Sequence, residues 1–137
     1  MTQSPQIKVR LVISSADVTP ETISEALQLT PNKIWLKGEV VHPKATNVHT
    51  ENGWVLGVES SDGELSAEKM IDKLIAIIPE RRLVILHDRY KDRLSVELSI
   101  IVQLSVSGAT PSVSLSQDQV TFLARCGGSL DVDMYPA

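Results

Sequence analysis

The sequence predicts an α+β fold, a two-layer sandwich in which helices pack on one face of a mainly antiparallel sheet. Two segments, residues 7–13 and 95–106, alternate apolar and polar side chains with the period of a half-buried strand. Other segments begin at a capping residue and then repeat apolar residues three and four apart, as amphipathic helices do. A length of 137 residues is typical of one domain, so we expect a single globular domain over residues 1–137.

The chain is expected to begin with a strand and a helix. The strand over residues 7–13 presents one apolar side, formed by Ile7, Val9, Leu11 and Ile13. In the helix that follows, Thr19 can cap the N-terminus and Pro20 fits the first turn. Pro31 is expected to stop this helix, because the residue before a proline is displaced from the α region.

Two short strands and a second helix should come next. Residues 34–36 and 54–58 are the predicted strands. The long polar connection between them holds two of the three histidines and is the best candidate for a mobile or functional loop. Ser66 is positioned to cap the second helix, and Pro79 to end or kink it.

Residues 80–91 fit either a buried strand or a helix, and the spacing of Leu83, Leu86 and Tyr90 favours a helix. The segment 95–106 is predicted to be a long central strand of roughly 40 Å, at about 3.3 Å per residue. Its regular alternation indicates antiparallel neighbours and one polar face, since buried parallel strands are usually continuously apolar.

The last helix and strand close the predicted fold. Ser116 and Gln119 form a capping box, and Gly127 supplies the left-handed residue that ends the helix. Residues 112–114 are a possible short strand before that helix. Alternation then predicts a closing strand through Leu130, Val132 and Met134.

Composition narrows the classes of function. A net charge of −4 disfavours a nucleic-acid partner, because sequence-independent binding to phosphates needs a basic patch. The one cysteine, Cys126, forms no internal disulfide, as is typical of proteins from a reducing compartment. Met1–Lys8 lacks an apolar signal core, and no run of about 18 apolar residues could span a membrane. We therefore expect a cytoplasmic protein with no membrane partner.

Several short motifs, in order along most of the chain, resemble a known bacterial family. They are Leu29-Thr30-Pro31 with Trp35, Lys37 and Gly38, then Asn52-Gly53-Trp54, and finally the closing segment Gly127–Tyr135. The chain resembles the family catalogued as domain of unknown function 4279. The resemblance implies a compact bacterial α+β domain without an established activity. Cys126 departs from the pattern of such sequences, which disfavours a cysteine-based role.

Candidate binding residues border the long polar connection. Tryptophan combines a large apolar surface with one N–H donor, which suits a pocket wall or an interface as well as a core. Core packing is the competing interpretation for both tryptophans. The candidate residues at this place are Trp35, Lys37, Gly38, Asn52, Gly53 and Trp54.

A second candidate site is the carboxylate pair Asp131 and Asp133 on the closing strand. Residues two apart on a strand share a face, with a separation of roughly 7 Å. The pair could hold a cation or act as acid and base, and a plain solvent-facing strand is the competing interpretation. His42, His49 and His87 lack the short spacing of zinc ligands, so the sequence predicts no metal site and no cofactor.

The leading functional hypothesis is a non-enzymatic binding or interaction module, for example an immunity-type protein. The common catalytic and nucleotide-binding motifs are missing from the sequence. The polar sheet face or the tryptophan-flanked loop would contact a protein partner or a small ligand, and Ile101, apolar within that polar face, favours such contact. One alternative is a small metal-assisted hydrolase that uses Asp131, Asp133 and a loop histidine. Another is a structural subunit that forms a homodimer through an exposed strand.

Overall fold

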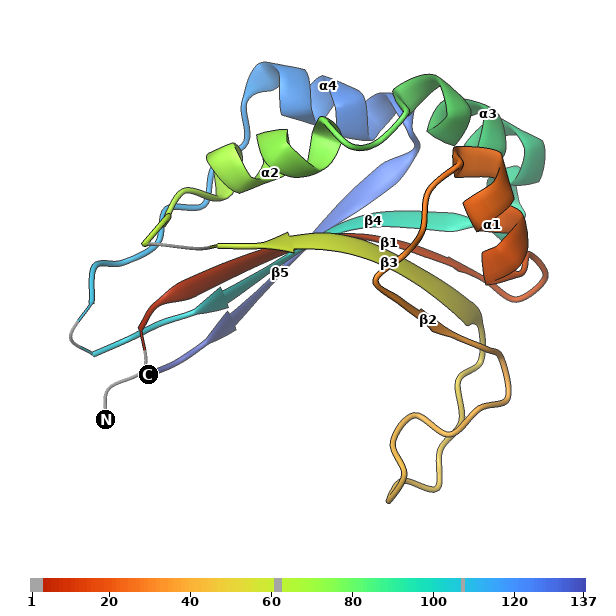
Figure 1. Ribbon diagram of the computed structural model, residues 1–137, viewed down its shortest axis with the longest axis horizontal. Helices are drawn as coiled ribbons and strands as arrows, with labels where there is room; N and C mark the ends of the chain where they lie inside the picture. The colour runs from red at the N-terminus through yellow and green to blue at the C-terminus, as the bar shows by residue number, and fades with distance from the viewer. Residues whose placement is uncertain (1–3, 61–62, 107) are drawn as a thin grey trace.

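The computed structural model describes residues 4–60, 63–106 and 108–137, which form a five-stranded sheet with four α-helices on one face (Figure 1). The strands are β1 (Gln6–Ser15), β2 (Lys33–Trp35), β3 (Asn52–Glu59), β4 (Ser95–Gln103) and β5 (Gly128–Tyr135). The helices are α1 (Pro20–Leu27), α2 (Ala67–Ile75), α3 (Glu80–Tyr90) and α4 (Gln117–Arg125), with a 3-10 turn η1 at Lys91–Arg93. The predicted α+β class is confirmed.

The strand order in the sheet is β2-β3-β1-β4-β5, with β1 at the centre. β1 is antiparallel to β3 and β4, and β2 is antiparallel to β3, but β5 runs parallel to β4. The prediction of antiparallel neighbours for the long strand was therefore wrong on the β5 side. Its predicted end at Val106 was also wrong: β4 ends at Gln103, because its neighbour β1 begins at Gln6, which pairs with Gln103.

One layer of apolar side chains fills the space between the sheet and the helices. The central strands contribute rows that face the helices: Ile7, Val9, Leu11 and Ile13 from β1, and Val96, Leu98, Ile100 and Val102 from β4. Trp54 of β3 is fully buried in this layer, and its indole Nε1 donates to Ser24 Oγ of α1 at 3.0 Å. Leu83 and Leu86 are also buried there, so the helical interpretation of residues 80–90 is confirmed.

The capping residues lie where the sequence predicted them, while two helix ends differ. Side-chain oxygens of Thr19, Ser66 and Ser116 accept the first-turn backbone N–H groups of their helices. α1 ends at Leu27, four residues before Pro31, because Gln28 takes the left-handed conformation. α2 ends at Ile75, well before Pro79. Residues 112–114 form only an isolated bridge between Ser66 and Ser112, so the short strand considered there was wrong.

All the helices lie on the same side of the sheet, and no described element covers the other side (Figure 1). We call this uncovered side the open face. It consists of the residues of each strand that alternate with the core rows, including Lys8 and Arg10 on β1. None of the described helices has the length and hydropathy needed to cross a bilayer.

Candidate functional site

The candidate residues lie at opposite edges of the sheet. Trp35, on β2, and Gly53, on β3, pair with each other at one edge, and the other residues singled out around the long connection lie beside them. Asp131 and Asp133 lie on β5, the strand at the other edge. The structure therefore separates them into two places, with the open face between them.

At the β2 edge, the Trp35 ring lies directly on Gly53. A Cβ atom added to Gly53 would come within 1.9 Å of Trp35 Cε2, so only glycine leaves room for the ring. The indole also stacks on His49, with 5.1 Å between the ring centroids and 18° between the planes. Trp35 is half-buried by these contacts and still reaches the surface.

The remaining candidates at this edge hold the backbone of the connection. Asn52 is buried; its Oδ1 accepts from the Lys37 backbone N–H at 2.9 Å, and its Nδ2 donates to the Val18 carbonyl at 3.1 Å. Gly38, at a φ of 93°, donates its backbone N–H to the His49 carbonyl at 2.8 Å. Trp54 belongs to the core, as described above. The contacts of Asn52, Gly38 and Trp54 are thus structural, whereas the Lys37 side chain is exposed.

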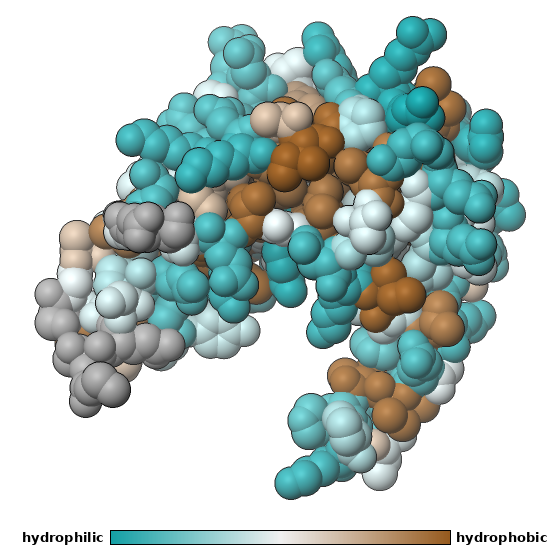
Figure 2. Space-filling model, in the orientation of Figure 1, coloured by the Kyte–Doolittle hydropathy of each residue, from teal (hydrophilic) through white to brown (hydrophobic). Residues whose placement is uncertain are grey.

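The connection itself, residues 36–51, projects from the body of the protein, and we call it the arm (Figure 1). Backbone bonds order it as a short hairpin, with Val41 N to the Asn47 carbonyl at 3.1 Å and His49 N to the Glu39 carbonyl at 2.8 Å. Apolar side chains gather on its surface (Figure 2). Those about half exposed are Leu36, Val40, Val41 and Val48. The sequence singled out this segment but not its valines, which stand among polar residues without a periodic pattern.

At the β5 edge, Asp131 and Asp133 are exposed on the open face, where they pair with Ser99 and Ile101 of β4. Their charges act on Glu97 of the same face. Burial first, and then the nearby charges of Asp131 and Asp133, raise the pKa of the Glu97 carboxyl, while the Arg10 guanidinium opposes them. The open face over β4 and β5 is therefore a region of concentrated negative charge.

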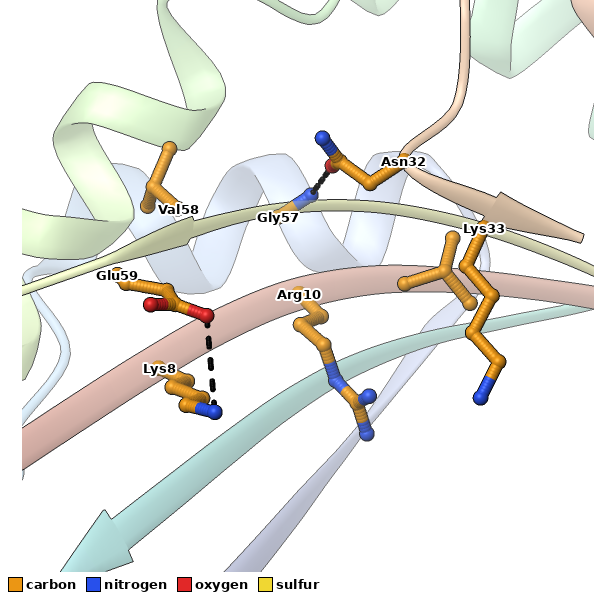
Figure 3. Close-up of a pocket in the computed structure, with 8 residues that line it drawn as sticks. Lys8, Arg10, Asn32, Lys33, Gly57, Val58 and Glu59 are labelled. Atoms are coloured by element: carbon orange, nitrogen blue, oxygen red, sulfur yellow. Dashed lines mark hydrogen bonds and ion pairs between the residues drawn. The ribbon is translucent and has the colours of Figure 1, made fainter.

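Cations occupy the other part of the open face. Figure 3 shows Lys8, Arg10 and Lys33 extending from the same side of the sheet around a hollow of about 310 Å³. A second hollow, of about 370 Å³, also borders Lys8 and Arg10 and reaches Ile101 and Tyr135. The Nε of Arg10 is buried and has no hydrogen-bond partner among the described residues. Lys8 and Arg10 were not among the residues singled out from the sequence. Their alternation with Ile7, Val9 and Leu11 is the signal that places both on the side of the strand opposite the core.

The histidines lie away from the carboxylate pair. His42 and His49 belong to the arm at the opposite edge, and His87 lies on α3, with its ring against the position where Gly127 would carry a Cβ. Within the described ranges, no three His, Cys, Asp or Glu side chains come together as a metal site would require.

Cys126 is fully buried at the end of α4. Burial first, and then the charge of Glu80, raise the pKa of its thiol to about 11, so it stays protonated at neutral pH.

Comparison with known proteins gives a family and no closer relative. Neither the curated proteins nor the solved structures contain a match to this chain. The sequence model of one family, described as Domain of unknown function (DUF4279), matches residues 5–137. Because this match spans nearly the whole chain, the protein belongs to the DUF4279 family.

Proposed function

We propose that this protein is a non-enzymatic binding module of a bacterial cytoplasmic family, and that it engages a protein partner through the arm. An immunity-type protein, which binds and neutralises another protein, is one form of such a module. The observation that carries the proposal is the set of half-exposed apolar side chains on the arm: Leu36, Val40, Val41 and Val48. An ordered hairpin that presents apolar side chains to water is typical of an interaction site.

The way the arm is built supports this use. A flexible segment loses conformational entropy when it binds, and this loss weakens its affinity. The hairpin hydrogen bonds already order the arm in the free protein, so less entropy is lost on binding. The bonds of Gly38 and Val41 within the arm, and the Trp35–His49 stack at its base, keep the valines in one arrangement. The partner that fits has an apolar surface, because the arm offers aliphatic side chains, while its formal charges, Lys37 and Lys44 against Glu39 and Glu51, balance.

Site-specific photo-crosslinking in cells tests the proposal. A photoreactive amino acid at Val41 or Val48 should give a discrete adduct with one protein. The same probe at Val120 or Ile77 is the matched control, because these are comparably exposed apolar residues on and beside the helices. Replacing Val41 and Val48 with lysine should abolish capture of the same protein from lysate, while Val120→Lys leaves it unchanged. Equal adducts from arm and helix positions would refute the proposal.

A further inference from the structure

The open face carries opposite charges in matching rows. In one row, Arg10 of β1 pairs with Ser99 of β4, which pairs with Asp131 of β5. In the next row, Lys8 pairs with Ile101, which pairs with Asp133. Each row therefore runs from a cation, across an uncharged residue, to a carboxylate.

These charges are incompletely neutralised within the chain. Among the described residues, Asp131 and Asp133 take part in no ion pair, and the Nε of Arg10 has no hydrogen-bond partner. Lys8 does have one, since its Nζ lies 3.6 Å from Glu59, and both side chains of that pair remain well exposed to water. An exposed pair of this kind is weak and leaves the lysine available to a second carboxylate.

We propose that the open face binds a second copy of the chain, face to face, about a two-fold axis that runs along β4. Rotation about an axis parallel to the strands exchanges β1 with β5 and keeps each residue at its level along the strand. Arg10 then meets Asp131 of the second copy, and Lys8 meets Asp133 of the second copy. Ile101 meets its own counterpart on the axis and supplies an apolar centre. Face-to-face packing of sheets with nearly aligned strands is a common arrangement.

Other symmetric pairings place like charges together. An axis across the strands would set β1 against β1, with Lys8 and Arg10 facing cations of the second copy. Edge-to-edge pairing of two β5 strands about Val132 would set Asp131 opposite Asp133 of the second copy. Like charges directly opposite each other destabilise a pairing. The arrangement along β4 is therefore the complementary one.

The area indicates a weak dimer. The overlap involves β1, β4 and β5 of each copy; strands about 4.8 Å apart and some eight residues long give a footprint of roughly 400 Å². A standard interface buries about 800 Å² on each partner. Glu97 also meets its own counterpart near the axis, which opposes association. We expect a dissociation constant on the order of 100 μM at low salt.

Sedimentation equilibrium between about 10 μM and 1 mM tests the pairing, since this range brackets the expected constant. The weight-average mass should rise toward twice that of the monomer and fall again when salt is added, because exposed charges are screened. An acid-reversed variant, Asp131→Lys with Asp133→Lys, should stay monomeric. A base-reversed variant, Lys8→Glu with Arg10→Glu, should also stay monomeric. An equimolar mixture of the two should dimerise, because every row then again faces opposite charges.

Matched controls change the net charge equally away from the open face. Glu25→Lys with Asp88→Lys, and Lys69→Glu with Lys73→Glu, alter exposed residues of the helices and should dimerise like the wild type. The arm variant used to test the proposed function, Val41→Lys with Val48→Lys, should do the same. A loss of partner capture with intact dimerisation thus separates the two proposals.

Three results would overturn this pairing: a monomer at about 1 mM, reversed variants that dimerise like the wild type, or a mixture that fails to associate. If circular dichroism shows that the base-reversed variant is unfolded, two milder variants decide. Arg10→Gln should then weaken the dimer several-fold and Glu97→Gln should strengthen it. Opposite results would refute the arrangement.

Discussion

Gly53 is a position where a single added methyl group should have a large local effect. In Gly53→Ala the new Cβ would lie 1.9 Å from Trp35 Cε2 and 2.1 Å from Trp35 Cζ2. Carbon atoms in contact are normally about 3.5 Å apart, so the indole would have to move outward by roughly 1.6 Å. That movement breaks the stack on His49 and lifts the ring from β3. Overpacking of this kind costs about 1–3 kcal/mol.

A double-mutant cycle isolates this contact. Urea unfolding, followed by far-ultraviolet circular dichroism, should show that Gly53→Ala lowers the free energy of unfolding by about 1–3 kcal/mol in the wild type. In a Trp35→Ala background the same change should cost less than about 0.5 kcal/mol, because the ring is gone and alanine suits a strand at least as well as glycine. An equal loss in both backgrounds would show that Gly53 is needed for some reason other than the indole.

Three further predictions concern buried or charged groups. Ser15→Ala should lower the free energy of unfolding, measured by urea titration, by about 2–4 kcal/mol. The fully buried Ser15 hydroxyl accepts from the Asp17 and Val18 N–H groups and donates to the Arg93 carbonyl. Ser14→Ala, at the half-exposed neighbouring residue, is the control. Glu97→Gln should raise the stability of the fold by less than about 1 kcal/mol at pH 7 and change it little at pH 4. The pKa of the Glu97 carboxyl is raised on folding, so its ionisation destabilises the folded protein as the pH rises through that pKa. Thermal unfolding at both pH values checks this, and a lower stability of the variant at pH 7 would contradict it. Cys126 should react with a thiol reagent at pH 8 only after urea unfolding, because it is fully buried with a pKa of about 11; rapid reaction of the native protein would contradict that burial.

The features that could be predicted from sequence are those with a local cause. A capping residue acts on N–H groups within its own first turn, so Thr19, Ser66 and Ser116 revealed the helix starts. The alternation of apolar and polar residues along a strand likewise indicates which side is buried, so the residues of β1 that face the core could be predicted. The choice of helix for residues 80–90 succeeded for the same reason, since Leu83 and Leu86 are one helical turn apart.

The features that could not be predicted depend on distant partners. The chain crosses through α4 between β4 and β5, and this crossover lets β5 run parallel to β4. The alternation of apolar and polar residues along a strand is the same whether its neighbour is parallel or antiparallel. Leu130, Val132 and Met134 continue the apolar row of a strand, yet they are 39–55% exposed because β5 lies at the sheet edge. The rows that join Lys8 and Arg10 to the carboxylates of β5 arise only from the strand order, which no local pattern records.

The arm has its own mechanical consequence for the molecule. It is tied to the body by the three-residue strand β2 and by the amide of Asn52, while the central sheet is held by β1 and its two long neighbours. Opening the arm therefore requires only a small part of the free energy of global unfolding. Its amide protons should exchange with solvent long before those of β1, and a protease should nick residues 42–47 while the rest of the fold stays intact. The arm can therefore open while the sheet stays folded, whereas unfolding of the sheet would also remove the base of the arm.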